Sequence, residues 1–185
     1  MGKKKNRNKQ EESAPLKKNY KPLIVKIGIA IIVLAVVSIF VLNNCQDETS
    51  EMHYHKFKKE GELTFVDSVD NPIVKIDIEI ADNEYERQLG LMNRESMEEM
   101  QGMLFIFPQE RYQSFWMLNT MFSLDIIFVN SNKEIVTIHK NTAPLSEQSY
   151  PSTAPAQYVV EVNAGFCDIH NIKIGDKVFW IGTKP

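Results

Sequence analysis

The sequence predicts an α+β domain with mostly antiparallel strands in a barrel-like arrangement and two or three short helices, preceded by one transmembrane helix. Three observations lead to this prediction. Short apolar runs separated by turn residues indicate about seven strands. Two helix-capping signals lie between the first two of these runs. One long apolar segment comes before all of them, and it has the length of a membrane span.

The long apolar segment covers residues 23–42. Its twenty residues would make a helix of about 30 Å, which is the thickness of a bilayer core. The segment has no polar face, and Lys26 lies near its start, where a long side chain can reach the lipid head groups. We therefore expect a transmembrane helix over residues 23–43.

The charge of the chain is divided around this segment. Residues 1–26 carry nine Lys and Arg and two acids, whereas the remaining residues carry twelve Lys and Arg and twenty-two acids. The positive-inside rule then predicts a cytoplasmic basic tail over residues 1–22 and a C-terminal domain outside the cytoplasm. An acidic domain argues against nucleic-acid binding, which needs positive charge on the domain itself. The expected partners are the membrane, through residues 23–43, and an unknown ligand or protein of the cell envelope.

Cys45 offers an alternative attachment, as the lipidated cysteine of a bacterial lipoprotein. Leu42 suits the cleavage site of such a protein, whereas Asn43 and Asn44 occupy positions that usually hold small residues. Retention of the segment and cleavage before Cys45 both place the domain outside the cytoplasm. Cys167 is the other cysteine, so we expect no disulfide within the domain and interpret Cys167 as a small buried hydrophobe.

Residues 44–62 are predicted to be a charged linker, and residues 63–185 the globular domain. The linker contains His53 and His55, but two histidines without a third ligand nearby are not typical of a metal site. Several methionines lie between residues 92 and 121, and thioethers suit Cu(I). Their positions in apolar runs favour packing in a core instead. We therefore expect no metal and no cofactor.

The first part of the domain is predicted to contain two strands with two helices between them. From residue 73 to residue 80 apolar and charged residues alternate, which is typical of a half-exposed strand. Asn83 is a candidate N-cap with an acid three residues later, and Gly90 is suited to end that helix in the left-handed conformation. A second capping signal predicts a short helix over residues 96–102, before a strand over residues 103–107.

The innermost strand is predicted at residues 124–129, which read LDIIFV. Continuous apolar residues after one acid indicate a strand buried on both faces. A turn at residues 130–133 and a strand over residues 134–139 would complete a hairpin. The expected elements after it are an irregular loop, a strand, a short helix or turn, and a last strand, at residues 141–156, 157–162, 163–172 and 177–181.

Five motifs follow one another along the domain. They are RQLGLMxR at residues 87–94, GMLFxF at 102–107, FWMxNT at 115–120, LDIxF at 124–128 and YVVEVNAG at 158–165. Over about residues 64–181 the chain thereby resembles the bacterial and archaeal family called domain of unknown function 192. Leu118 and Ser123 depart from the family pattern, which has Lys and Pro at these places. The resemblance implies a compact β-rich domain, often exported or tethered, without an established activity.

The candidate site consists of arginines, an indole, an amide, a hydroxyl, an imidazole and carboxylates of the domain. These residues are Arg87, Arg94, Trp116, Asn119, Thr120, Asp125, His139 and Glu161. Such side chains suffice for acid–base chemistry or for binding an anionic ligand. We expect them to meet at the polar end of the innermost strand.

Several of these residues also have a purely structural interpretation. Asp125, at the mouth of a buried strand, would accept backbone N–H groups of the Asn119–Thr120 turn or pair with Arg94. His139 is interpreted as a hydrogen-bonded rim residue on the strand face of Ile135 and Thr137. Phe115 and Trp116 are adjacent on a predicted strand, so one of the two rings is expected in the core and the other at the rim.

Three functions of different classes fit the sequence. The first, which we predict, is a binding or accessory module of the cell envelope, with a groove bordered by Arg94, Trp116, Asn119 and Asp125. The second is an envelope-directed hydrolase that uses Asp125 or Glu161, and the third is a structural partner of an envelope complex. An enzyme predicts a pocket that contains a carboxylate of raised pKa. A binding module predicts aromatic walls and paired carboxylates, and a structural partner predicts an exposed apolar patch.

Overall fold

The computed structural model describes residues 26, 29, 31–39 and 56–182. The chain divides into two units, residues 1–51 and residues 52–185. Cys45, and with it the alternative lipid attachment, lies outside the described residues.

The described residues of the first unit are helical. Within the described part of the chain, no helix combines the length and the apolar character that crossing a membrane requires. Our prediction of a transmembrane helix as part of the fold is corrected accordingly. The other residues of segment 23–43, the whole of residues 1–22 and most of the linker 44–62 lie outside the described residues.

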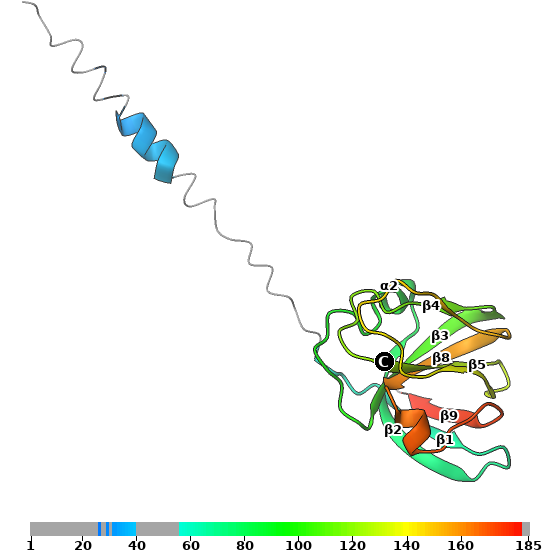
Figure 1. The fold of residues 1–185 in the computed structure, drawn as a ribbon. Helices are drawn as coiled ribbons and strands as arrows, with labels where there is room; N and C mark the ends of the chain where they lie inside the picture. Colours follow the sequence, from blue (N-terminus) through cyan, green and yellow to red (C-terminus); the bar gives the residue numbers. More distant parts are fainter. Residues whose placement is uncertain (1–25, 27–28, 30, 40–55, 183–185) are drawn as a thin grey trace, which may run out of the picture. The chain divides into compact units, whose positions relative to one another are not determined.

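Residues 56–182 form a domain around one large sheet, which Figure 1 shows with its flanking helices. Its strands are β1 (Gly61–Val66), β2 (Pro72–Ala81), β3 (Gln101–Arg111), β5 (Leu124–Val129), β6 (Ile135–His139), β8 (Ala156–Asn163) and β9 (Lys177–Gly182). They lie in the order β6-β5-β8-β3-β2-β1-β9, and every neighbouring pair is antiparallel except β2 and β3. A small sheet pairs β4 (Ser114–Phe115) with β7 (Tyr150–Pro151), and the helices of the domain are α2 (Glu84–Leu89) and α3 (Phe166–Ile169).

The large sheet does not close into a barrel, so the barrel-like prediction was wrong. Its two edge strands, β6 and β9, are joined in the described part of the chain by an isolated bridge between Glu134 and Lys177. Beside this bridge the Lys133 Nζ lies 3.5 Å from the ring centroids of both Tyr158 and Trp180. These cation–π contacts fix the turn before β6 against β8 and β9, and the sheet remains open along the rest of its edges.

Each face of the sheet buries a hydrophobic cluster. Alternate residues of a strand point to opposite faces, and β5 is buried along its whole length. Ile127 therefore joins the cluster that contains Phe166 of α3, whereas Ile126 and Phe128 join the cluster that contains Phe105. The prediction that this strand is buried on both faces is confirmed, but β5 is not the innermost strand, because it lies next to the edge strand β6.

The predicted first helix is confirmed as α2. The Asn83 Oδ1 accepts the backbone N–H of Glu86 at 3.0 Å, which satisfies one of the free donors at the start of the helix. Gly90 follows the helix with a φ of 49°, a value that costs glycine little. Asn83 and Gly90 thus set the two ends of α2, the helix that follows β2.

The prediction of a second helix over residues 96–102 was wrong. The segment is an irregular turn that leads into β3. The side-chain amide of Asn163 donates to the carbonyls of Met97 and Glu98, at 2.9 Å and 3.1 Å. The Glu98 carbonyl also accepts the backbone N–H of Gln101 at 3.1 Å, which is the bond of a single turn and not of an α-helix.

Candidate functional site

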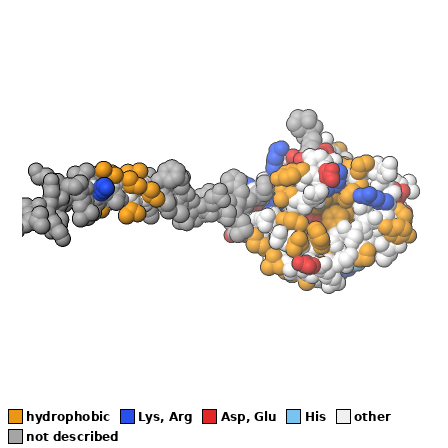
Figure 2. All heavy atoms as spheres, turned by 90° about the horizontal axis from the view of Figure 1, so that it is seen from above, with side chains coloured by type: hydrophobic (Ala, Val, Ile, Leu, Met, Phe, Trp, Pro, Cys, Tyr) orange, Lys and Arg blue, Asp and Glu red, His pale blue; other side chains and the backbone are white. Residues whose placement is uncertain are grey.

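A groove of about 880 Å³ lies between α2 and the C-terminal part of β3. β2 pairs with β3 over Gln101–Phe105, and after Ala81 the chain leaves the sheet towards α2. The last residues of β3 therefore extend beyond β2 and form a wall of the groove. The residues that line it are Glu84, Arg87, Gln88, Phe107, Pro108, Gln109, Arg111, Gln113, Ser114, Phe115 and Trp116. Figure 2 looks onto the end of the domain that carries α2 and β4, and shows hydrophobic side chains in and around a hollow.

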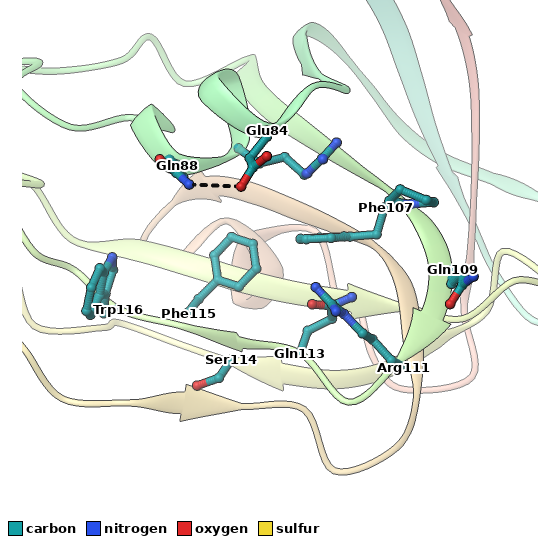
Figure 3. Close-up of a pocket in the computed structure, with 11 residues that line it drawn as sticks. Glu84, Gln88, Phe107, Gln109, Arg111, Gln113, Ser114, Phe115 and Trp116 are labelled. Atoms are coloured by element: carbon teal, nitrogen blue, oxygen red, sulfur yellow. Dashed lines mark hydrogen bonds between the residues drawn. The ribbon is translucent and has the colours of Figure 1, made fainter.

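Aromatic rings form the floor of the groove (Figure 3). The Phe115 ring meets Phe107 edge-on, with 6.3 Å between the ring centroids. It also packs edge-on against the core residues Phe105 and Phe128, at 5.0 Å and 5.7 Å. Trp116 is 53% exposed and stands at one end of the groove. The prediction that one of the adjacent rings packs in the core and the other lies at the rim is confirmed.

Polar side chains form the rim, and they differ in how firmly they are held. The Arg87 Nη1 donates to the carbonyls of Asp82 and, at 3.0 Å, of Ile106, and its guanidinium carbon lies 5.5 Å from the Phe107 ring centroid. Arg87 is therefore a fixed part of the wall. Arg111 is exposed and has no ion pair among the described residues. Its guanidinium group is available to a ligand.

A second group of polar residues is buried under the loop that precedes β3. Glu79, Met103 and Glu161 are register neighbours on β2, β3 and β8. Arg94 is buried and forms an ion pair with Glu79, while the Arg94 Nε has no hydrogen-bond partner among the described residues. Loop residues with Lys56 and Phe57 line a cavity of about 400 Å³ beside Arg94, and Glu161 is not among its lining residues.

Burial raises the pKa of Glu161 to about 8, although the positive charge of Arg94 acts in the opposite direction. A carboxyl group in an apolar surrounding keeps its proton because the charged form loses its hydration. Glu161 is therefore mostly a neutral acid at pH 7. The loop before β3 brings Arg94 close to Glu161 of β8, as the sequence led us to expect. Glu79 of β2 joins them, although the alternating pattern of its strand indicated that it is exposed.

Asp125 lies on the opposite face of the sheet, away from both groups. Its Oδ1 accepts the backbone N–H groups of Asn141 and Gly165, and its Oδ2 accepts that of Cys167. Burial, with a further contribution from Asp125, raises the pKa of the Cys167 thiol. The structural interpretation of Asp125 as a buried acceptor is confirmed, but its donors are neither the Asn119–Thr120 turn nor Arg94.

The remaining candidates belong to neither group. Asn119 is exposed in a left-handed turn, and Thr120 beside it is buried. The His139 Nε2 is hydrogen-bonded to the carbonyl of Pro151 at 2.8 Å, in keeping with a rim residue. His139 shares its strand face with Thr137, as expected, whereas Ile135 packs in the cluster on the other face because β6 is bulged between them.

The structure thus divides the predicted site. Arg87 and Trp116 line the groove, Arg94 and Glu161 are buried together, and the other candidates are apart from both. Residues that the sequence did not single out complete the two groups: Glu79, Gln88, Phe107 and Arg111. Gln88 and Phe107 belong to quoted motifs and so carried a signal, whereas nothing in the local pattern marked Arg111.

These features define a domain over residues 56–182 with an open, mostly antiparallel sheet and an aromatic groove at one end. The family DUF192, described as "Uncharacterized ACR", matches residues 65–180. The chain belongs to this family, which confirms the resemblance seen in its motifs.

Relatives of this chain are found in archaea. A UPF0127 protein of Pyrococcus furiosus is 32% identical over 109 residues, which cover 58% of this chain and 89% of the relative. A UPF0127 protein of Pyrococcus abyssi is 34% identical over 109 residues, covering 56% of this chain and 86% of the relative.

Two solved structures share the fold. A protein from Sinorhizobium meliloti 1021, provisionally described as a transcription regulator, superposes with a TM-score of 0.63 and 31% identity, covering 68% of this chain and 98% of that protein. A protein of unknown function from Novosphingobium aromaticivorans gives a TM-score of 0.61 and 33% identity, covering 64% of this chain and 84% of that protein.

Proposed function

We propose that this protein is a binding module whose ligand occupies the groove between α2 and β3. The observation that carries the proposal is the aromatic lining of the groove, with Phe107 and Phe115 in its floor and Trp116 at one end. Concave sites with apolar walls and a few directed polar groups are the usual form of a ligand-binding site. Glu84, the carboxylate of the groove, is hydrogen-bonded to Gln88 at 3.5 Å rather than isolated.

The alternative of a hydrolase has less support. Asp125 is fully buried and accepts three backbone N–H groups, so its oxygens are occupied. Glu161 has the raised pKa of a candidate acid, but it lines neither of the two cavities described above. A general acid must reach the group to which it gives a proton.

A role in the cell envelope remains part of the proposal. Its support is the uneven charge of the chain, with a basic segment over residues 1–26 and an acidic remainder. The binding role of the groove does not depend on this location, because every residue that lines the groove belongs to the globular domain.

A ligand screen tests the binding function. The full chain, isotopically labelled and kept in a mild detergent because of its apolar segment, would be mixed with saccharides, short peptides and small carboxylic acids. We expect saturable shifts of the backbone amide signals of Gln113, Phe107 and Trp116. Trp116→Ala should abolish these shifts, since it removes an exposed ring of the groove.

Leu145→Ala is the matched control for this screen. Leu145 is an exposed apolar residue, 65% accessible, and it is not among the residues that line the groove. The control should leave binding unchanged. A screen without groove shifts, or shifts that survive Trp116→Ala, would contradict the proposed function.

A further inference from the structure

The backbone of β3 along the groove offers little to an extended peptide. Arg87 reaches the carbonyl of Ile106 from α2, while the Gln157 side chain reaches the carbonyl of Phe107 from β8, at 3.3 Å. Backbone groups of successive residues in a strand point to opposite sides. The pairing of β3 with β8 is irregular between Ile106 and Arg111, so this alternation does not continue along the groove.

Two residues of this stretch are also unsuited to pairing with another chain. The carbonyl of Ile106 is bonded to Arg87, and Pro108 has no N–H to donate. Proline and charged side chains are the usual means by which an edge strand avoids pairing with another chain. Peptides that add a strand to a sheet gain their affinity from main-chain hydrogen bonds. Strand addition at this edge is thus disfavoured, and recognition must depend on side chains.

The side chains of the groove suit a sugar. A pyranose ring has apolar C–H faces, which can lie on Phe107 and Trp116, and neighbouring hydroxyl groups around its edge. Gln109 and Arg111 present paired planar polar atoms at the rim, which can bond two adjacent hydroxyl groups at once. Trp116 stands at one end of the groove, and Gln109 and Arg111 stand at the other (Figure 3).

We propose that the groove binds an oligosaccharide, with a carboxylate-bearing sugar unit at the Arg111 end. This inference rests on the proposed binding function. Arg111 is exposed and carries no ion pair within the described part of the chain. A guanidinium group matches a carboxylate with two parallel hydrogen bonds. Arg87 is held in the wall by two carbonyls through its Nη1, so Arg111 is the less restrained of the two guanidinium groups.

Binding of defined oligosaccharides to the full chain tests the inference. The probes are hexasaccharides of galacturonic acid and of glucose, together with a library of random decapeptides. We expect the acidic hexasaccharide to bind more tightly than the neutral one. Arg111→Met should weaken binding of the acidic hexasaccharide by about tenfold, in keeping with a charge-assisted hydrogen bond, and change binding of the neutral one by less than about twofold.

The possible outcomes separate this inference from the proposed function. Peptides that bind in the groove, with loss of binding in Trp116→Ala and no binding of either saccharide, would overturn the inference and leave the binding function standing. Saccharide binding that neither Trp116→Ala nor Arg111→Met changes would also overturn the inference. If neither saccharides nor peptides bind, the inference falls together with the proposed function.

Discussion

The carboxylate of Asp125 accepts the backbone N–H of Cys167 at 2.9 Å, across 42 residues of sequence. Its other oxygen accepts the N–H groups of Asn141 at 2.9 Å and of Gly165 at 3.2 Å. One fully buried side chain of β5 thereby holds the loop after β6 and the start of α3. Asp125 is a structural residue that joins three segments of the fold.

Asp125→Asn is expected to lower the free energy of unfolding by about 1–3 kcal/mol, because one acceptor oxygen becomes an N–H₂ donor that faces backbone donors. Urea denaturation followed by circular dichroism measures the change. Asp168→Asn removes the same charge at an exposed position, where Asp168 pairs with Lys140, and should change stability by no more than about 0.5 kcal/mol. Equal stabilities of Asp125→Asn and the wild-type chain would show that the three hydrogen bonds do not hold the fold.

Local patterns of sequence predicted most of the strands because strand periodicity reflects burial. In β2 the residues Ile76, Ile78 and Ile80 alternate with charged residues, and all three are buried in one cluster. The run from Leu124 to Val129 has no polar residue except Asp125, and it is a buried strand that contributes residues to both clusters. These patterns depend on a residue and its near neighbours alone.

The errors arose where residues distant in sequence decide the outcome. Glu79 continues an alternating strand and was expected to be exposed, but the loop with Arg94 covers it and supplies an ion pair. A capping signal at residue 96 did not produce a helix, and the side chain of Asn163 binds two carbonyls of that segment. Whether the sheet closes into a barrel depends on how far its edge strands β6 and β9 pair with each other. They share an isolated bridge in the described part of the chain, and no local sequence pattern indicates this.

Glu161→Gln is expected to stabilise the domain above pH 5. Burial raises the pKa of Glu161 to about 8 from 4.5, so the folded domain holds a proton that the unfolded chain releases. The folded state then binds more protons than the unfolded state, and stability falls as pH rises through this window, by roughly 1 kcal/mol per pH unit. Glutamine keeps the neutral form at every pH, so the difference between the variant and the wild-type chain should grow from pH 5 to pH 8.

Urea unfolding at pH 5, 6.5 and 8 would measure this difference, with a buffer of constant ionic strength. Glu84→Gln is the control, since Glu84 is an exposed residue of α2. Its difference from the wild-type chain should stay constant over the same range. Parallel pH profiles of Glu161→Gln and the wild-type chain would show that Glu161 is ionised in the folded domain.

Cys167 is expected to resist alkylation in the folded domain. The thiol is buried, and burial together with Asp125 raises its pKa, whereas the reactive species is the thiolate. In a Cys45→Ser chain, iodoacetamide at pH 8 should leave Cys167 unmodified over a time in which the urea-unfolded chain reacts completely. Mass spectrometry measures the modified fraction. Rapid modification of the folded chain would mean that the segment around α3 opens readily.

Arg87 and Arg111 both line the groove, but only Arg87 is expected to matter for stability. Arg87→Met keeps an apolar stem beside Phe107 and removes the bonds to the carbonyls of Asp82 and Ile106. Its free energy of unfolding should fall by about 1–2 kcal/mol, while Arg111→Met should stay within about 0.5 kcal/mol of the wild-type value, because Arg111 is exposed. Hydrogen exchange of the α2 amides should also accelerate in Arg87→Met, since the lost bonds tie this helix region to β3. Equal losses in the two variants would mean that Arg111 has a structural partner, and its assignment to ligand binding would then be wrong.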